Sequence, residues 1–371
     1  MLDSSENAEA ISFGISGREA RISSPQTFLN VKSSLSIKIV GGIGDYMIAM
    51  RFIADLALAS EPFSVDIYCG QPDVVEWVFK SVKCFNTARS EFLFDRTAQH
   101  YDASVWLSHA IVIDVPDFAS RHLVSAPRLR EALLTAVERS KPLKEFAFRR
   151  PVPDNQIARL AVRAGCTRMT FSHWIFGIDP TNSQHKLHVE RSATSRFGLD
   201  AVPYVTIHNG HDRNVVLLGQ TSTKFYPRFS EVVCKVRQEF PHIKFLQVGT
   251  KDDIRIENTD FDLRGQTSLP EVAGLIDKAL CHLDVESGLV HMAHCLETPA
   301  VVVFGPTPVD YFGYPDYSAI PPQACGDCWA TQDTWMALCP RGHKVPVCTQ
   351  QSPDLIAQAL SARLANMTSS M

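Results

Sequence analysis

The stretch from residue 284 to residue 307, DVESGLVHMAHCLETPAVVVFGPT, constrains the fold more than any other part of the sequence. An apolar strand candidate ends at Asp284, a tight corner follows at residues 286–288, and residues 289–296 suit a short helix. Residues 300–304 are fully apolar and rich in valine, as strands buried in a parallel sheet are. The stretch therefore predicts a strand–corner–helix–strand unit of an α/β fold.

The corner of this unit is suited to binding an anion. Gly288 has no side chain to keep the backbone away from a ligand. The helix that begins there directs unpaired N–H groups and the positive end of its dipole toward the same point. We expect a diphosphate in this place. The alternative is an ordinary strand–turn–helix of an α/β core, and the stretch alone does not decide between the two.

Strand and helix patterns alternate along the rest of the chain, which predicts parallel sheets with helices on both faces. The predicted strands are residues 35–40, 65–69, 104–107, 111–115, 204–208, 243–248, 279–284 and 300–304. The predicted helices are residues 46–59, 72–81, 126–140, 228–240, 289–296, 353–364 and the segment that follows a capping box at residues 268–271. A length of 371 residues favours about two domains. The polar segment 179–202 is predicted to link them.

Composition excludes several classes of protein. A net charge of −4 argues against a general nucleic-acid binder, although a local basic cleft for phosphates is compatible with it. No apolar run approaches the roughly 20 residues that span a bilayer. Residues 1–35 are polar and rich in serine, so we predict a flexible tail and no secretory signal. Ten cysteines fit a cytoplasmic protein as thiols or metal ligands better than as disulfides.

The residues of the 284–307 stretch resemble the nucleotide-sugar site of the ADP-heptose glycosyltransferases. These comprise the lipopolysaccharide heptosyltransferases and the related protein and autotransporter heptosyltransferases. The family usually has Asp where this chain has Glu286, and the resemblance extends more weakly from about residue 37 to residue 364. The matching residues are Glu286, Ser287, Gly288, His291, Ala293, Pro299, Phe304, Gly305, Pro306 and Thr307.

The resemblance implies the GT-B fold, in which two Rossmann-like domains face each other across a ligand cleft. Residues 36–185 would form the acceptor domain and residues 200–350 the nucleotide-sugar domain. A helix at residues 353–366 would pack back on the N-terminal domain. The implied activity is that of an inverting glycosyltransferase, which moves a sugar from a nucleotide-diphosphate sugar to an acceptor hydroxyl. ADP-heptose is the favoured donor, and the acceptor is a protein Ser/Thr or a saccharide.

Asp45 is the candidate catalytic residue. It follows Gly41-Gly42-Ile43-Gly44 at a point where a predicted strand gives way to a helix. The spacing is not that of the G-x-G-x-x-G dinucleotide fingerprint. The family has Gly-x-Gly-Asp in this loop, and the resemblance implies that Asp45 is the general base for the acceptor hydroxyl. The alternative is a helix cap, which stabilises a first turn by about 1 kcal/mol.

Several further residues are predicted to bind the nucleotide sugar. Lys224 precedes a helix and matches a family lysine, which would neutralise the diphosphate leaving group, so no catalytic metal is expected. His208 ends the first strand of the second half and would contact phosphate or acceptor, unless it is simply solvated. His291 and His294 could pair on a metal, but the family match makes His291 a site residue and leaves His294 as packing. Glu286, Ser287, Gly288 and Thr307 complete this predicted site.

Four cysteines near the C-terminus form a second motif. Cys325, Cys328, Cys339 and Cys348 have the spacing C-x2-C-x10-C-x8-C, which can supply four thiolates to one zinc or iron ion. Free thiols or two disulfides are the alternatives. The pattern Cys-x-x-Cys-Trp with Cys-Pro-Arg is similar to the autotransporter heptosyltransferases, in which a cysteine-bound iron is structural.

Two other functions stay open at this point. A nucleotide-sugar epimerase shares the architecture but needs additional carboxylates around the sugar, which we do not identify. A non-catalytic binding or assembly module, stapled by the metal, is the other alternative. The chain is also compatible with a homo-oligomer.

Overall fold

The computed structural model describes residues 32–368 except 109–110, 144–154, 182–186 and 211–220. Residues 32–371 make one compact unit. The predicted tail of residues 1–35 falls almost wholly outside the described residues, and the first strand begins at Ser33. The domain boundaries and the linker drawn from the sequence stay predictions.

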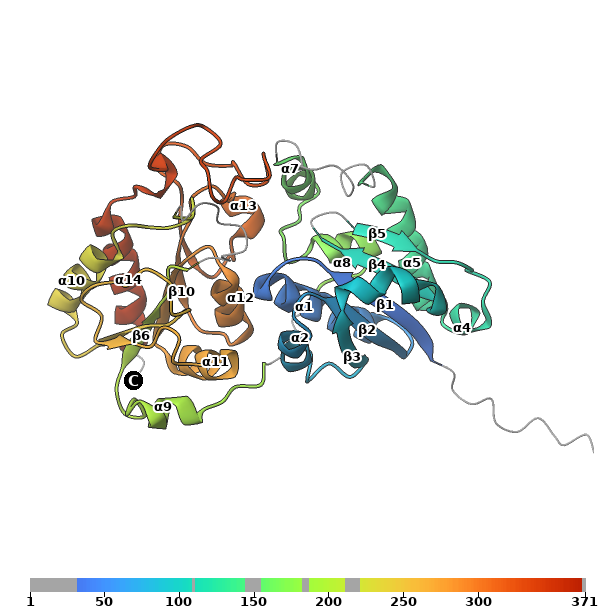
Figure 1. Cartoon of the computed structure of the whole chain (residues 1–371), viewed down its shortest axis with the longest axis horizontal. Coiled ribbons are helices and arrows are strands. Elements are labelled where there is room, and N and C mark those ends of the chain that lie inside the picture. Colours follow the sequence, from blue (N-terminus) through green and yellow to red (C-terminus); the bar gives the residue numbers. More distant parts are fainter. Residues whose placement is uncertain (1–31, 109–110, 144–154, 182–186, 211–220, 369–371) are drawn as a thin grey trace, which may run out of the picture. The chain divides into compact units, whose positions relative to one another are not determined.

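The strands of the described residues form two sheets, of five and six strands (Figure 1). The N-terminal sheet has the order β3-β2-β1-β4-β5, and the C-terminal sheet has the order β11-β10-β9-β6-β7-β8. The strands are β1 Ser33–Ile39, β2 Phe63–Cys69, β3 Phe85–Ser90, β4 Ala103–Leu107, β5 Ile111–Asp114, β6 Tyr204–Ile207, β7 Lys244–Gln247, β8 Phe261–Asp262, β9 Cys281–Val285, β10 Ala300–Val303 and β11 Ser318–Ile320.

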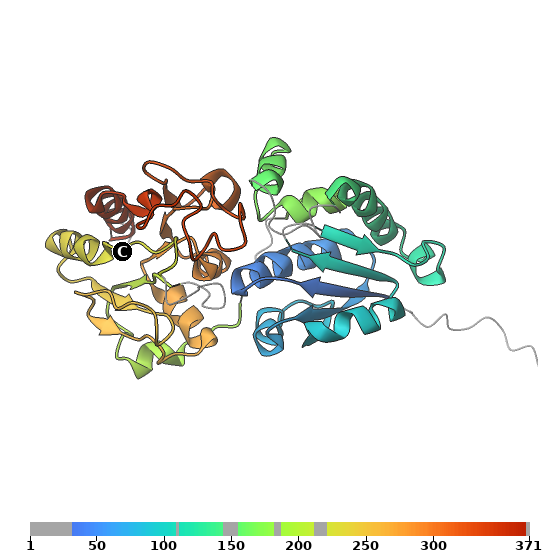
Figure 2. The same cartoon turned by 45° about the horizontal axis from the view of Figure 1, so that its top comes forward.

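Helices cover both faces of each sheet, as the alternating pattern predicts (Figures 1 and 2). The helices that the structure describes are α1 Ile43–Ala59, α2 Pro72–Val78, α3 Phe94–Thr97, α4 Arg121–Val124, α5 Pro127–Ser140, α7 Gln156–Arg163, α8 Phe171–Phe176, α9 Ser192–Arg196, α10 Phe229–Glu239, α11 Leu269–Lys278, α12 Gly288–Cys295, α13 Val309–Phe312 and α14 Pro353–Thr368. The predicted capping box is present at the start of α11, where Glu271 Oε2 accepts the Ser268 N–H at 2.8 Å.

One strand pair departs from the predicted parallel arrangement. β5 pairs antiparallel with β4, whereas the other recorded pairs of both sheets are parallel. The reason is the short connection between residues 107 and 111. A parallel pair needs a crossover of a dozen or more residues, so two strands this close in sequence pair as a hairpin.

The last helix lies on the C-terminal sheet. α14 packs against α10 and strands β9 to β11, and its residues Ile356, Leu360 and Leu364 are fully buried there. Figure 1 shows α10 and α14 on one side of this sheet and α11 and α12 on the other. The structure corrects the expectation that residues 353–366 pack on the N-terminal domain. The apolar spacing i, i+4, i+8 predicts a buried face but does not say which surface covers it.

A continuous apolar core joins the two sheets. One cluster runs from β1 and α1 into α11, α12 and one face of β10, and a second cluster lies between the other face of the C-terminal sheet and helices α10 and α14. α1 and α12 pack directly on each other. The N-terminal ends of both helices are therefore brought together, and each follows a glycine-containing corner.

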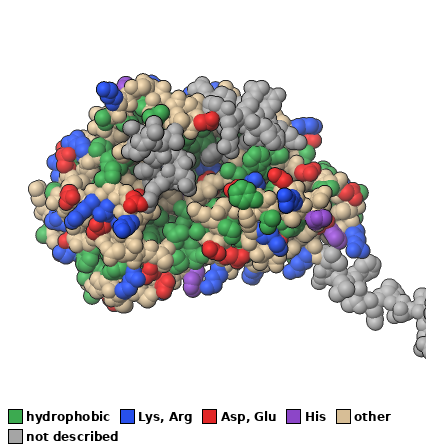
Figure 3. All heavy atoms as spheres, viewed as in Figure 1, with side chains coloured by type: hydrophobic (Ala, Val, Ile, Leu, Met, Phe, Trp, Pro, Cys, Tyr) green, Lys and Arg blue, Asp and Glu red, His purple; other side chains and the backbone are tan. Residues whose placement is uncertain are grey.

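The surface is mixed in charge. On the face drawn in Figure 3, basic and acidic side chains are interspersed, in keeping with the small net charge. Among the helices that the structure describes, none combines the length and the apolar character needed to span a bilayer.

Candidate active site

Asp45 lies in the first turn of α1, and both of its carboxylate oxygens have a partner. Oδ2 accepts the N–H of Gly42 at 3.0 Å, which is the helix cap considered as the alternative role. Gly41 has φ 140°, and a Cβ there would overlap Asp45 Oδ2, so only glycine fits this turn. Oδ1 accepts a hydrogen bond from Arg168 Nη2 at 2.6 Å. The carboxylate thus caps its helix and also pairs with a distant cation.

Arg168 lies between α7 and α8 and is only 6% exposed. Burial alone would lower the pKa of this guanidinium, but its interactions with Asp45, Tyr311 and Glu286 outweigh burial and hold the pKa above its ordinary value. Arg168 was not among the residues predicted from the sequence. Its position, 123 residues from Asp45, carries no local motif that could have revealed the pair.

The corner before α12 is organised by Ser287. The Ser287 hydroxyl accepts the Leu289 N–H at 3.1 Å, which caps the helix, and donates to Asp284 Oδ2 at 2.5 Å. Ser287 was predicted to bind the nucleotide sugar. The structure gives its side chain a capping role, which leaves the backbone of the corner as the part available to a ligand.

Gly288 meets the N-terminal half of the chain. A Cβ on Gly288 would overlap Ile43 Cγ2 and would lie 3.2 Å from the Gly44 nitrogen. A Cβ on Gly44 would lie 2.5 Å from Cδ2 of His291. The two glycine corners, residues 41–44 and 286–288, are therefore in close contact. The sequence predicted a close approach of the Gly288 backbone to a diphosphate, and this stays a prediction. In the structure, the start of α1 lies against Gly288.

We expect Gly288→Val to lower the melting temperature and the affinity for ADP together. The sequence alone predicted that this change would weaken nucleotide binding and leave the fold largely intact, but the added carbons would also overlap Ile43. A second change, Ile43→Ala, should restore part of the melting temperature because it removes the overlapping methyl groups. Thermal unfolding and calorimetric ADP titration measure both effects. Wild-type melting and binding in Gly288→Val would contradict the close contact.

His291 lies where several charged residues converge. Its Nδ1 is 2.7 Å from the Tyr314 hydroxyl, and its side chain is buried. The pKa of His291 is lowered overall, chiefly by burial. The carboxylates of Glu286 and Asp45 oppose this effect, and the cations Arg168 and Lys224 add to it. His291 is therefore neutral at pH 7. Its surroundings also show that Asp45 and Arg168 lie within electrostatic range of Glu286 and Lys224.

His294, three residues along α12, packs as predicted. Its ring stacks on Tyr314 with centroids 3.8 Å apart, and Nε2 is 3.2 Å from Arg51 Nη1. His291 and His294 thus have separate partners. Within the described part of the chain, no three or more His, Cys, Asp or Glu side chains are grouped so that they could hold a metal ion.

Lys224 and Glu286, both predicted site residues, form an ion pair. Lys224 Nζ lies 2.5 Å from Glu286 Oε2, and the two side chains are 13% and 8% exposed. The residue before Lys224 is anchored to a distant loop, because the N–H of Thr223 donates to Met336 O at 2.8 Å and its hydroxyl donates to Trp335 O at 2.9 Å. The position of Lys224 therefore depends on residues 335–336.

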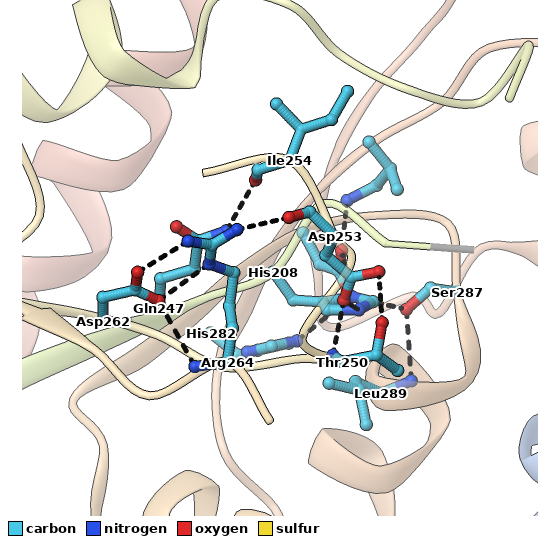
Figure 4. Close-up of polar contacts among 12 residues, drawn as sticks. His208, Gln247, Thr250, Asp253, Ile254, Asp262, Arg264, His282, Ser287 and Leu289 are labelled. Carbon is cyan, nitrogen blue, oxygen red and sulfur yellow. Dashed lines mark hydrogen bonds and ion pairs between the residues drawn. The ribbon is translucent and has the colours of Figure 1, made fainter. Parts of the chain in front are cut away.

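His208 lies at the end of β6 in a buried polar network (Figure 4). Its Nδ1 is 3.0 Å from both oxygens of Asp284, and Nε2 is 3.8 Å from Asp253 Oδ2. Burial would lower the pKa of His208, but these two carboxylates outweigh burial and raise it. Asp284 also accepts a hydrogen bond from the Ser287 hydroxyl, so His208 supports the corner before α12 through Asp284. Neither carboxylate was predicted as a partner, although Asp284 opens the 284–307 stretch.

Thr307 follows β10 and is 1% exposed, and its hydroxyl has no hydrogen-bond partner among the described residues. The loop before it is held by residues 325–349, the cysteine-rich C-terminal tail. The N–H of Trp329 donates to Pro306 O at 3.0 Å, and a Cβ on Gly305 would meet Thr349 Cγ2 at 2.7 Å and Cys348 Sγ at 3.7 Å. The tail thus contacts both loops, 222–224 and 305–307, that carry predicted site residues.

The four predicted metal ligands lie in this tail as free thiols. Burial and then the charges of Cys325, Cys339 and Cys328 raise the pKa of Cys348 to about 12. Burial likewise raises the pKa of Cys328, although Arg341 opposes the rise and Cys325 and Cys339 add to it. The four sulfurs are therefore within electrostatic range of one another, but they are not arranged as a metal site in this structure.

The sequence model of one protein family, described as glycosyltransferase family 9 (heptosyltransferase), matches residues 137–333, which is more than half of the chain. The chain belongs to glycosyltransferase family 9. It is accordingly a glycosyltransferase, and the resemblance seen in the sequence is confirmed. The family match includes Arg168, Lys224 and the corner before α12, but not Asp45 or the last two cysteines.

Solved structures of this family share the fold of the chain. ADP-heptose lipopolysaccharide heptosyltransferase II of E. coli has a TM-score of 0.55 at 16% identity, over 90% of this chain and 99% of that one. The family 9 glycosyltransferase of Veillonella parvula has a TM-score of 0.51 at 13% identity, over 91% and 99%. The dodecameric iron-containing heptosyltransferase TibC, with ADP-D-beta-D-heptose, has a TM-score of 0.56 at 13% identity, over 91% and 77%. No curated protein sequence matches the chain.

Proposed function

We propose that this family 9 glycosyltransferase is an inverting enzyme that transfers heptose from ADP-heptose to an acceptor hydroxyl. The observation that supports this most is the convergence around His291, where Asp45 and Arg168 from one half of the chain meet Glu286 and Lys224 from the other. The proposed base, Asp45, and the proposed cation for the leaving group, Lys224, thus both lie near His291. A transfer reaction between two bound substrates requires such a base and cation close together. ADP-heptose is also the substance bound in TibC and part of the name of the E. coli relative.

In the proposed reaction, the Asp45 carboxylate accepts the proton of the acceptor hydroxyl. The acceptor oxygen forms a bond to the anomeric carbon as the bond from that carbon to the diphosphate breaks, and ADP leaves with the electron pair. Lys224 and the backbone N–H groups at the start of α12 stabilise the negative charge that develops on the diphosphate. Inversion follows because the hydroxyl attacks from the side opposite the leaving group.

The ion pair of Lys224 with Glu286 gives each residue a role in donor binding. The ammonium group, held at 2.5 Å by Glu286, is directed toward the corner before α12. We propose that Lys224 contacts the diphosphate and that Glu286, in the place of the usual Asp, contacts the sugar. His208 supports the same corner through Asp284, and the carboxylates of Asp284 and Asp253 outweigh burial and raise its pKa. The backbone of Gly288 and the hydroxyl of Thr307, which has no partner in the described residues, complete the proposed contacts.

We propose that Cys325, Cys328, Cys339 and Cys348 hold one structural iron or zinc ion. The donor set fits such an ion, because four thiolates suit both metals and their sulfurs lie within electrostatic range of one another here. A bound metal would supply four fixed bonds to a tail that has little regular structure. The relative TibC is an iron-containing heptosyltransferase. No catalytic metal enters the proposal.

The acceptor and the assembly are proposed by comparison with the relatives. A saccharide acceptor agrees with the lipopolysaccharide enzyme, and a protein Ser/Thr agrees with the cysteine pattern shared with the autotransporter enzymes. TibC is also dodecameric, so we include a homo-oligomer. We place the protein in the cytoplasm, in agreement with its ten cysteines, six of which lie outside the predicted metal site.

A thermal-shift panel of nucleotide sugars tests the donor. ADP-heptose should raise the melting temperature more than UDP and GDP sugars at equal concentration, because the ligand with the lower Kd stabilises the folded protein more. A ligand at 100 times its Kd stabilises by about 2.7 kcal/mol. Product analysis by mass spectrometry and chromatography then separates transfer from isomerisation. Greater stabilisation by a UDP or GDP sugar would replace the proposed donor. Conversion of the sugar nucleotide into an isomer would favour the epimerase.

A further inference from the structure

We propose that Arg168 is a positioning residue, which holds the Asp45 carboxylate in the orientation that accepts the acceptor proton. The proposal rests on the proposed role of Asp45 as the base. It adds a residue that no sequence motif indicated.

The two side chains differ in exposure in the way that this role requires. The Arg168 side chain is 7% exposed and that of Asp45 is 23% exposed. The guanidinium therefore lies on the protein side of the pair, and the Asp45 side chain keeps an exposed face toward solvent. Arg168 leaves that exposed face to an acceptor, since the cation itself has almost no access to it.

Two donors from separate parts of the chain fix the carboxylate plane. Arg168 Nη2 holds Oδ1 at 2.6 Å, and the Gly42 N–H holds Oδ2 at 3.0 Å. Rotation of the carboxylate about its last side-chain bond would break both hydrogen bonds at once. A carboxylate oxygen has two lone pairs, so an oxygen that accepts one hydrogen bond keeps the capacity to accept a proton. Fixed orientation of a base contributes to the rate because a small misplacement of reacting groups is costly.

Arg168 also links the base to the part of the chain that carries the proposed donor contacts. The Arg168 backbone N–H donates to Tyr311 O in α13 at 2.7 Å, and α13 directly follows the loop of Thr307. The loop that carries Arg168 is braced at its start by Cys166, whose N–H donates to Ala161 O at 2.8 Å. The orientation of Asp45 is therefore set relative to α13 as well as to its own helix.

The charges that face Asp45 come from several elements. Arg168 is a cation in direct contact, and His291 of α12 is close enough to feel the charge of Asp45. Tyr46 of α1 and Tyr311 of α13 also interact with it, and each has a pKa raised to about 12, so both are neutral at pH 7. Glu286 and Lys224 face the same point through His291. Loss of Arg168 would thus remove a cation in contact with the carboxylate and favour its protonation.

The test uses Arg168→Gln, which removes the charge, and Arg168→Lys, which keeps the charge but not the planar donor geometry. The readout is ADP released from ADP-heptose with water as the acceptor, measured against pH, together with calorimetric affinity for ADP. Arg168→Gln should release ADP roughly tenfold to a hundredfold more slowly, and the acid limb of its rate profile should move to higher pH. Arg168→Lys should return the acid limb toward the wild-type position with only part of the rate. ADP affinity should stay near wild type in both.

Arg163→Gln is the matched control, because Arg163 is an exposed arginine on α7, five positions earlier in the chain, and it should leave rate and profile unchanged. An unchanged acid limb in Arg168→Gln, with Asp45→Asn inactive, would overturn the positioning role alone. A fully active Asp45→Asn would instead overturn the proposed function.

A second measurement applies if Arg168→Gln folds poorly or if water is too slow an acceptor. Carbon-13 NMR of the aspartate carboxyls is recorded for wild type and for Arg168→Lys. The Asp45 signal is identified by its loss in Asp45→Asn. Titration of that signal should stay near wild type because the lysine keeps the charge, but its chemical shift should change because the planar donor is lost. An unchanged carboxyl chemical shift with retained ADP binding would again exclude the role.

Discussion

Asp45→Asn is expected to lower the rate of sugar transfer by about 10²–10⁴-fold while the affinity for ADP stays near wild type. The amide cannot accept the proton of the acceptor hydroxyl. The nucleotide is proposed to bind Lys224 and the corner before α12, whereas the Asp45 carboxylate is held by Gly42 and Arg168. Initial rates of ADP formation from ADP-heptose and calorimetric titration with ADP measure the two quantities separately.

The same substitution at another helix gives the control. Asp73 is an exposed acidic residue in the first turn of α2. Asp73→Asn should leave transfer unchanged. Asp45→Asn should also melt somewhat earlier, because the amide has a single acceptor oxygen where the carboxylate accepts from both Gly42 and Arg168, and a weakened helix cap costs up to about 1 kcal/mol. Transfer at the wild-type rate together with earlier melting would show that Asp45 is a helix cap and nothing more.

Replacement of Cys325, Cys328, Cys339 or Cys348 by Ser is expected to lower metal content and thermal stability together. Binding of structural zinc contributes about 10–16 kcal/mol in small zinc domains at pH 7, so the loss of one ligand is a large effect. The tail holds Thr223 and the loop at Gly305. Affinity for ADP should therefore fall in the same variants, because Lys224 and Thr307 lose their support. Elemental analysis, thermal unfolding and ADP titration of the same preparations measure all three.

Cys234→Ser provides the comparison for the cysteine variants, because Cys234 is an exposed thiol on α10 and should be neutral in every assay. Protein purified without chelators that contains neither iron nor zinc would exclude the metal. Serine variants that retain the wild-type melting temperature would exclude a structural role for it.

Much of the fold could be predicted from local patterns. The valine-rich run became β10, and the capping box at residues 268–271 marks the start of α11. The strands that were not predicted are β3, β8 and β11. β8 and β11 are very short, and β3 and β8 contain no fully buried residue, so neither an apolar run nor an alternating pattern was long enough to detect.

The candidate site could be predicted only as far as its backbone corners. A glycine between a strand and a helix is visible in the sequence, and both corners, at Gly44 and Gly288, lie at the starts of helices as expected. The side-chain partners are set by packing between distant segments. Nothing local to Arg168 indicates that it meets Asp45, and the buried contact of His208 with Asp284 arises because β6 and β9 are neighbours in the sheet.

The contact between Gly44 and Gly288 has a consequence for reading kinetic data on variants. Ile43 belongs to the half that is proposed to bind the acceptor, yet its methyl group limits the space at Gly288, where the donor is proposed to bind. A variant of the first corner can therefore change the Michaelis constant for the donor, and a variant of the second can change that for the acceptor. Assignment of a residue to one substrate thus needs binding measured for each substrate alone, because steady-state constants from the complete reaction will mix the two.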